Sequence, residues 1–256
     1  MVKIHFLGTC SGTEPIAGMH HCSLVFEIGG TYYWFDAGES CAYTAHTSGM
    51  DIMKTEALFV SHPHIDHIGG MPNLFSCMNK LIKRYGMELQ NGNSLEIFLP
   101  DRDILDAVIK ISTLKGRMHF TLNEHQIRDG VIFEDKNLRV TAQHNCHIST
   151  TELNSFSFLI EAEGKKIVFS GDVRSPYELD PLIGAGVDVL IMETGHHKVI
   201  DVCEYAAARG VEKLYFNHHG REIIDDRPAA ESLTAEFAKT YNMPIVICHD
   251  GMIAEI

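Results

Sequence analysis

The chain has 256 residues, 45% of them hydrophobic, and a formal net charge of −13 at pH 7. This length suits one large domain or two small ones. No apolar run approaches about 18 residues, so the sequence predicts no membrane-spanning helix, and the acidic charge disfavours a long nucleic-acid groove.

The beginning of the chain and its cysteines favour a cytoplasmic location. MVKIHFLGTCSG (1–12) predicts a strand and lacks the long apolar stretch and small-residue cleavage site of a signal peptide. The seven cysteines are odd in number and form no CxxC pair. This usage indicates reduced thiols and not a disulfide framework.

The first half of the chain predicts strands interrupted by two helices. Gly29-Gly30 lies between two apolar segments and is a two-residue hairpin signal. Pro72 fits the first turn of a helix, and Gly86 fits its C-terminal stop. We predict strands at 2–8, 23–28, 31–36, 57–61 and 95–100, and helices at 71–86 and 101–113.

Strands dominate from residue 118 until helices return near the end. A turn is predicted at Glu163-Gly164, and Gly210 is predicted to close a helix. His249-Asp250-Gly251 is interpreted as the turn of a final hairpin. We predict strand segments at 118–122, 131–143, 156–172, 187–193, 211–217 and 244–256, and helices at 199–210 and near 228–241.

Sixteen histidines, many of them clustered, are the unusual feature of the composition. In the stretch SHPHIDHIGG, which follows a predicted buried strand, Pro63 excludes a helix interior. Alternate residues of an extended segment face the same way, so His62 and His64 can hold one ion. Asp66 and His67 follow a bend and can hold a second ion. Imidazole and carboxylate without cysteine suit Zn²⁺, Mn²⁺ or Fe²⁺; the alternative is a solvated polar turn.

H-x-H-x-D-H after a short apolar strand resembles the signature of the metallo-β-lactamase superfamily, and the resemblance covers the whole chain. It implies an α/β (α+β) fold, a four-layer αβ/βα sandwich of two mixed β-sheets with helices on the outer faces. The whole of 1–256 is then expected to be a single metal-dependent hydrolase domain.

Four further motifs carry the resemblance. FLGTCSGTEP is similar to the first loop of the superfamily, and FDAGES to its Asp-Gly motif, in which Asp36 would orient the ligand turn without binding metal. FSGD is similar to the strand end whose aspartate, here Asp172, bridges two ions. NHHG is similar to the last ligand loop, with His218 as the ligand.

One more histidine ligand is expected before the strand that leads to the bridging aspartate. His144 and His147 both qualify by position. The superfamily places this ligand a few residues before a strand start similar to Ser155-Phe156, so His147 is preferred, although TTELN makes the gap longer than usual. His144 stays open as the alternative.

The resemblance therefore implies a dinuclear site with a hydroxide and an aspartate bridging the ions. Two divalent ions, with Zn²⁺ preferred and Mn²⁺ or Fe²⁺ as alternatives, would lower the pKa of water and neutralise charge on the electrophile. Asp66 is implied both as a ligand and as a catalytic residue. The implied metal ligands are His62, His64, Asp66, His67, His147, Asp172 and His218.

The stretch 193–220 resembles the ribonuclease Z branch, which has a His-Ser-Thr-like motif, an alanine-rich helix, a strand and then a ligand histidine. His196 corresponds to the first residue of that motif, and would contact the phosphate or protonate the leaving oxygen. Glu193 is either its orienting partner or a carboxylate at a helix entry. His197-Lys198 replaces the Ser-Thr of the branch.

Two departures favour a small substrate over transfer RNA. Members that process transfer RNA insert a long arm between the last histidine before the hairpin and the bridging aspartate, whereas 24 residues separate His147 from Asp172 here. Together with the charge of −13, this favours a small-molecule phosphodiester, such as a cyclic phosphate or nucleotide, over nucleic acid. Relatives are often dimers, so a homodimer is a further possibility that the resemblance implies.

Several residues have both a structural and a functional interpretation, and the sequence leaves the choice open. His20 and His21 either line the mouth of the site or belong to a solvated loop, and Arg221 either meets substrate phosphate or makes a surface ion pair. His219 is interpreted as a neighbour of the ligands. Cys146, next to His147, either lines the site or is an ordinary reduced thiol, and the second interpretation is preferred.

The sequence therefore predicts a metal-dependent phosphodiesterase. The enzymatic alternatives are a transfer-RNA 3′-processing endonuclease of the ribonuclease Z type and an acyl hydrolase acting on a thioester or lactone. The non-enzymatic alternative is a metal-bound scaffold or sensor that has lost turnover.

Overall fold

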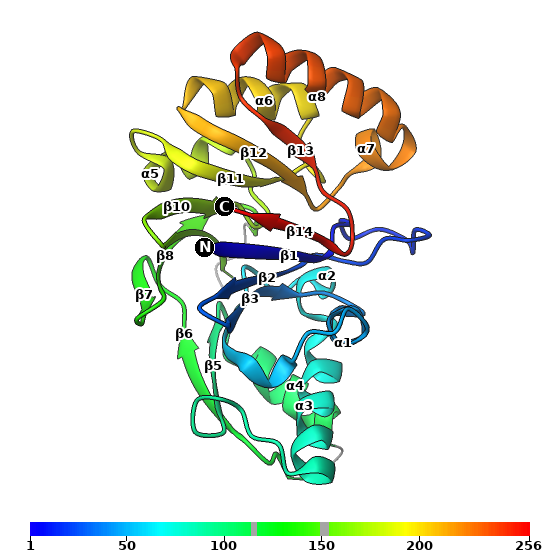
Figure 1. Cartoon of the computed structure of the whole chain (residues 1–256), viewed down its shortest axis with the longest axis vertical. Helices are drawn as coiled ribbons and strands as arrows, with labels where there is room; N and C mark the ends of the chain where they lie inside the picture. The colour runs from blue at the N-terminus through cyan, green and yellow to red at the C-terminus, as the bar shows by residue number, and fades with distance from the viewer. Residues whose placement is uncertain (114–116, 149–153) are drawn as a thin grey trace.

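The computed structural model describes residues 1–113, 117–148 and 154–256. Two seven-stranded β-sheets lie face to face in it, with helices on both outer sides (Figure 1). The first sheet has the order β14 (Met252–Glu255), β1 (Val2–Gly8), β2 (Ser23–Ile28), β3 (Thr31–Ala37), β4 (Thr55–Phe59), β5 (Ser94–Leu99) and β6 (Thr121–Gln126). The second has the order β13 (Ile245–Ile247), β12 (Val211–Asn217), β11 (Val187–Glu193), β10 (Lys165–Phe169), β9 (Ser155–Ala162), β8 (Leu138–Asn145) and β7 (Gly130–Glu134).

Both sheets are mixed, and they share one pattern of strand directions. In the first sheet, β14, β1, β2 and β3 pair antiparallel, and β3, β4, β5 and β6 pair parallel. In the second sheet, β7 to β10 pair antiparallel, and β10 to β13 pair parallel. Parallel strands of a sheet end at the same edge, so the loops that follow them are brought together.

Apolar side chains between each sheet and its helices make the outer layers. The first sheet packs against α1 (Cys41–Thr47), α3 (Met71–Tyr85) and α4 (Asp103–Thr113) through one buried cluster. A second cluster joins the other sheet to α5 (Asp180–Ile183), α6 (Val199–Ala208), α7 (Arg221–Asp225) and α8 (Arg227–Tyr241). The predicted four-layer sandwich is confirmed, with α6 and α8 above and α3 and α4 below in Figure 1.

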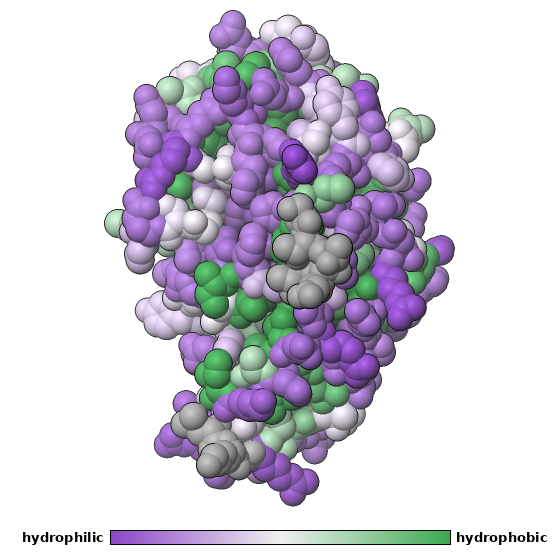
Figure 2. Space-filling model, turned by 180° about the vertical axis from the view of Figure 1, so that it is seen from behind, coloured by the Kyte–Doolittle hydropathy of each residue, from purple (hydrophilic) through white to green (hydrophobic). Residues whose placement is uncertain are grey.

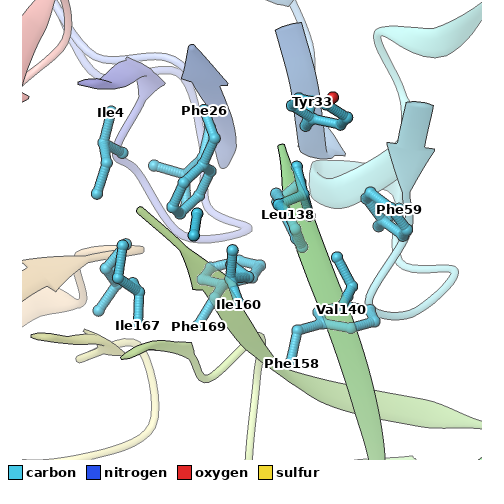
Figure 3. Close-up of a cluster of buried hydrophobic side chains, with 14 of the residues drawn as sticks. Ile4, Phe26, Tyr33, Phe59, Leu138, Val140, Phe158, Ile160, Ile167 and Phe169 are labelled. Carbon is cyan, nitrogen blue, oxygen red and sulfur yellow. The ribbon is translucent and has the colours of Figure 1, made fainter. Parts of the chain in front are cut away.

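Aromatic and branched side chains fill the space between the two sheets. Figure 3 shows Ile4 and Phe26 of the first sheet facing Ile160 and Ile167 of the second. Phe35 lies in the same cluster and is fully buried. Its ring centroid is 4.9 Å from that of Phe59, 5.0 Å from that of Phe26 and 5.6 Å from that of Phe158, so it joins rings of both sheets.

Most predicted elements agree with the structure, and local signals explain why. Gly29 and Gly30 both have positive φ, as does Gly86 after α3, and Glu163-Gly164 turns between β9 and β10 with φ of 52° and 75°. These are the conformations that primed hairpin turns and helix C-caps need.

Two predictions about elements are wrong. The strand expected at 118–122 begins at Thr121 and continues to Gln126, because pairing with β5 selects the register and not local propensity. His249-Asp250-Gly251 is no hairpin turn, since β13 pairs with β12 and β14 pairs with β1 in the other sheet. For Glu193 the structure excludes one of the two open interpretations, the helix entry, because this residue ends β11, six residues before α6 begins.

The face of the molecule seen in Figure 2 is mainly polar. Hydrophilic residues cover most of the face seen in Figure 2, with apolar residues showing mainly in its lower half. Among the described residues, no helix combines the length and the apolar character that crossing a membrane requires.

Replacing Phe35 by alanine tests the importance of the layer between the sheets. We expect Phe35→Ala to lower the free energy of unfolding by about 3–5 kcal/mol, because a buried aromatic side chain is lost and a cavity forms. The exposed Tyr43 provides the control: Tyr43→Ala should change it by less than about 0.5 kcal/mol. Urea unfolding of both variants measures the difference, and equal midpoints would contradict this role.

Candidate metal centre

The candidate site lies where the chain leaves β4, β8, β10 and β12. These segments are far apart in the sequence, yet their side chains meet: His67 Nε2 lies 3.2 Å from His218 Nε2 and 3.4 Å from Asp172 Oδ1. The two sheets also bond directly here, since the Phe156 N–H donates to the Ser61 carbonyl at 2.9 Å. The site is therefore built at one edge of the sandwich by both sheets.

The histidine-rich turn changes from extended to helical within a few residues. His64 is extended, with φ −64° and ψ 148°, and caps the one-turn helix α2 (Ile65–Ile68), which carries Asp66 and His67. After it the backbone comes close to the loop that follows β3, and a Cβ on Gly70 would lie 2.0 Å from the Gly38 carbonyl oxygen. Only glycine fits such an approach.

Asp36 holds this turn in place through its fully buried carboxylate. It accepts hydrogen bonds from the Ser61 N–H, from the Ser61 hydroxyl and from His67 Nδ1, each at 2.7 Å. Because a carboxylate can only accept, His67 Nδ1 carries a proton, and Nε2 is the ring nitrogen that faces the site. The Ser61 hydroxyl in turn accepts from His62 Nδ1 at 3.0 Å, which leaves His62 Nε2 unprotonated. The expected orienting role of Asp36 matches these contacts.

Three histidines form one group of converging nitrogens, which we call the first trio: His62, His64 and His147. His64 Nδ1 lies 3.0 Å from His62 Nε2 and 3.3 Å from His147 Nε2. His144 is not part of it: its ring packs on Phe156, and it is exposed. The TTELN segment, on which the choice between the two histidines partly depended, lies largely in 149–153, outside the described residues.

Asp66, His67 and His218 form a second group, the second trio. Asp66 Oδ2 lies 3.1 Å from His218 Nε2 and 3.3 Å from His67 Nε2. His218 has φ 48°, a conformation that costs a non-glycine residue on the order of 1–3 kcal/mol and is typical of functional positions.

The Asp172 carboxylate lies between the two trios. Its Oδ2 is 3.7 Å from His62 Nε2 and 3.6 Å from His147 Nε2. Its Oδ1 is 3.4 Å from both His67 Nε2 and His218 Nδ1. Buried Oδ1 has no hydrogen-bond partner among the described residues, and neither has His218 Nδ1.

The donor set fits divalent cations by distance. Ligand atoms about 2.1 Å from a tetrahedrally bound Zn²⁺ lie about 3.4 Å from one another. Most neighbouring nitrogen and oxygen atoms within the two trios are 3.0 to 3.3 Å apart. Both trios occur among the groups of ligand atoms that lie within 4.8 Å of one another.

The charges also fit cations. Burial opposes ionisation of Asp172, but the charges of His218 and His67 outweigh it and hold the pKa of this carboxyl below its ordinary value. Burial and the neighbouring imidazoles lower the pKa of His62, so its ring stays neutral. Burial acts the same way on His218, yet Asp172 and Asp66 raise its pKa to about 9. The carboxylates thus create a field that favours positive charge.

His196 and Glu193 form a pair next to the trios. The His196 N–H donates to Glu193 Oε2 at 2.9 Å, and His196 Nδ1 donates to both carboxylate oxygens at 3.0 Å. This hydrogen bond raises the pKa of His196. The His196 side chain is 45% exposed and its ring lies 4.8 Å from the His147 ring, so the imidazole is accessible beside the cluster. Asp172, Glu193, His196 and His218 form a further group that could hold a cation.

The remaining candidates lie around the cluster and make ordinary contacts. His20 pairs with Glu39 at 3.2 Å, and Arg221 pairs with Glu14 and Asp225. The buried His219 donates from Nε2 to the Cys248 carbonyl at 2.9 Å. Sequence reasoning missed the relay through Ser61, although this serine directly precedes the histidine motif.

Comparisons with known proteins agree with this architecture. A family model described as Anti-Pycsar protein Apyc1 matches residues 2–201. A ribonuclease Z from Methanothermobacter thermautotrophicus is 24% identical over 275 aligned positions, which cover 85% of this chain and 86% of the relative.

Two solved structures share the fold over nearly their whole length. The metallo-β-lactamase fold protein YhfI from Bacillus subtilis has a TM-score of 0.76 and 17% identity, covering 100% of this chain and 99% of the other. A diphosphatase from the PhnP family has a TM-score of 0.70 and 14% identity, covering 100% and 98%.

These matches confirm the predicted metallo-β-lactamase fold, the ribonuclease Z-like branch and the class of metal-dependent hydrolases. The family model spans most of the sequence, from the first strand to the start of α6. The chain therefore belongs to the family described as Anti-Pycsar protein Apyc1, and it has the metallo-β-lactamase fold.

Proposed function

We propose that the chain is a dinuclear metal-dependent phosphodiesterase that hydrolyses a small or nucleotide-like phosphodiester. The observation that carries the proposal is the Asp172 carboxylate, which directs one oxygen to each trio. The first trio would hold one ion and the second trio the other, with Zn²⁺ the preferred metal. When bound, two such ions lower the pKa of water and neutralise charge on the phosphodiester.

The protein groups divide the remaining work. Hydrolysis joins a hydroxyl oxygen to phosphorus and breaks the bond to the leaving oxygen, which takes up a proton. His196 is the proton donor in this proposal, because Nδ1 is bound to Glu193 and Nε2 faces away from that bond. Glu193 supports the role by favouring the protonated ring. Asp66 acts as a ligand to the second ion.

A small substrate is favoured by charge and by the short connection after the first trio. Seven residues separate His147 from Ser155 at the start of β9. That length supports no separate arm for gripping RNA, and a net charge of −13 repels a phosphate backbone. The fold neighbour named a diphosphatase has the same overall extent.

Two alternative activities remain to be tested. A relative that aligns with most of the chain is named ribonuclease Z, which favours transfer-RNA 3′ processing as the second candidate. An acyl hydrolase acting on a thioester or lactone would use the same pair of ions. Transfer-RNA processing also cleaves a phosphodiester and differs from the proposed function in the size of the substrate. The acyl hydrolase differs in the bond, because it cleaves a carbonyl–sulfur or carbonyl–oxygen bond.

A substrate panel separates these activities. We expect metal-loaded protein to hydrolyse bis-p-nitrophenyl phosphate and small nucleotide phosphodiesters, and to leave a thioester and a precursor transfer RNA unchanged. Chelator-treated protein is the control, because loss of the ions removes the activated water. Turnover of the thioester alone, or of the RNA alone, would replace the proposed function by that alternative.

Replacing each of the two candidate histidines by alanine, one at a time, tests the first trio. We expect His147→Ala to lower the metal content from two ions per chain to about one, because His147 Nε2 lies among the converging nitrogens. His144→Ala is the matched control: it removes the same side chain three residues earlier and should retain two ions. Elemental analysis of both purified variants measures this. Two ions in His147→Ala and one in His144→Ala would reverse the assignment.

A series of leaving groups tests His196 as the proton donor. We expect His196→Ala to reduce kcat on the order of 10²- to 10⁴-fold for alkyl phosphodiesters, whose leaving oxygen needs a proton. For bis-p-nitrophenyl phosphate the loss should be much smaller, because p-nitrophenolate leaves without one. His46→Ala, on the exposed end of α1, is the control. An equal loss for all leaving groups would exclude proton donation and leave His196 a binding role.

A further inference from the structure

The turn between β13 and β14 carries a carboxylate with long-range partners. Asp250 Oδ1 accepts hydrogen bonds from the Thr9 N–H at 2.9 Å and from the Thr9 hydroxyl at 2.7 Å. Its Oδ2 accepts from the His20 N–H at 2.6 Å. Thr9 and His20 are the two ends of the segment that joins β1 to β2, so one side chain near the C-terminus closes this segment at its neck.

This segment, the first loop (Thr9–Cys22), projects beyond the end of β1 in Figure 1, next to the chain that leads into β14. A further bond across its neck runs from the Cys10 N–H to the His20 carbonyl at 2.8 Å. The neck is therefore held twice, once by the loop's own backbone and once by Asp250.

Beyond its neck the first loop touches the candidate metal centre. A Cβ on Gly12 would lie 2.8 Å from Asp66 Oδ2, so the loop backbone lies directly against this member of the second trio. The Ser11 hydroxyl donates to the His219 carbonyl at 2.7 Å, and the His219 N–H donates to the Thr9 carbonyl at 2.7 Å. The loop thus joins the turn that carries Asp66 to the turn that carries His218.

We propose that Asp250 is a positioning residue that holds the first loop against Asp66 and the His218–His219 turn. This inference rests on the proposed function for the role of the second trio. Asp250 bonds to none of the three residues of that trio and acts through the loop. It fixes the backbone of the first loop that packs against Asp66, and thereby the direction in which Asp66 and His218 present their ligand atoms.

A carboxylate is suited to this position because it accepts on both oxygens. Burial raises the pKa of Asp250, whereas the hydrogen bonds from Thr9 and His20 act in the opposite direction and favour the ionised form. An asparagine of the same shape has one acceptor oxygen, and its NH₂ group would face the N–H of Thr9 or of His20. One backbone donor would then lose its partner, which disfavours the closed neck.

Asp250→Asn tests the proposal with Asp188→Asn as the matched control. Asp188 also accepts a hydrogen bond from a backbone N–H, that of Lys166. It lies near the start of β11, at the opposite end of the strand from Glu193. We expect faster amide hydrogen exchange across residues 9–21 in Asp250→Asn, and exchange like that of wild type in Asp188→Asn. In titrations with Zn²⁺, Asp250→Asn should bind the ion of the second trio more weakly, and its affinity for the ion of the first trio should be unchanged. The value of kcat/KM should fall on the order of 10- to 100-fold.

Thr9→Val is a milder second variant in case Asp250→Asn folds poorly. It removes the hydroxyl donor alone, so loop exchange and affinity for the second ion should change in the same direction by less. In Thr9→Val/Asp250→Asn the two effects should be non-additive, because both substitutions disturb the hydrogen bonds between the same two residues. Changes that add independently would overturn the proposal.

The remaining outcomes separate this proposal from the proposed function. Unchanged exchange of the first loop in Asp250→Asn overturns the positioning role, whatever the enzyme hydrolyses. Faster exchange with unchanged affinity for the second ion also overturns it, since the loop then moves without affecting Asp66. If wild-type protein binds two ions but hydrolyses no phosphodiester, the proposed function fails while the exchange and Zn²⁺ titrations still decide the role of Asp250.

Discussion

Carboxylates buried together at one edge of the sandwich need compensating positive charge, and this requirement organises the structure. Asp172, Asp66 and Glu193 are each almost fully buried at one edge of the sandwich. An uncompensated buried charge is costly, whereas cations held by several ligands compensate it. The imidazoles that surround these carboxylates can supply the nitrogen ligands that divalent metals prefer, once a cation replaces the protons that His67 and His218 carry. A site of this composition is stable as a site for cations and is poorly explained as a polar turn.

The surrounding structure limits the freedom of the side chains at this edge. Asp36 and Ser61 set the proton positions of His67 and His62 through direct hydrogen bonds. Glu193 does the same for His196 from the end of β11. These partners lie in strands or, for Ser61, directly after one, and the other side chains of those strands form the core, so the packing that stabilises the two sheets also orients the site.

The sequence predicted the parts of the site that depend on short spacing. His62, His64, Asp66 and His67 lie within six residues, and their ligand chemistry is visible without a fold. Asp172 and His218 were placed by resemblance, and the structure brings them to the same edge. The sequence favoured His147 but left His144 as an alternative. The two histidines are three residues apart at the end of β8, and the fold decides which ring turns toward the other ligands.

Features that depend on distant partners could not be predicted. Asp250 was interpreted as part of a hairpin because His249-Asp250-Gly251 has the residue types of a hairpin turn. Its partners Thr9 and His20 are more than 200 residues away in the sequence. The extent of β6 follows from pairing with β5 and not from its own composition. The one-turn helix α2 lies within the histidine-rich turn and is too short to produce a periodic signal in the sequence.

The most direct test of the pair of ions is anomalous X-ray diffraction from crystals of the Zn²⁺-loaded protein, measured on both sides of the zinc absorption edge. The account predicts two zinc peaks about 3.5–4 Å apart, one within each trio, with Asp172 between them. A single peak, or peaks remote from Asp172, would contradict it.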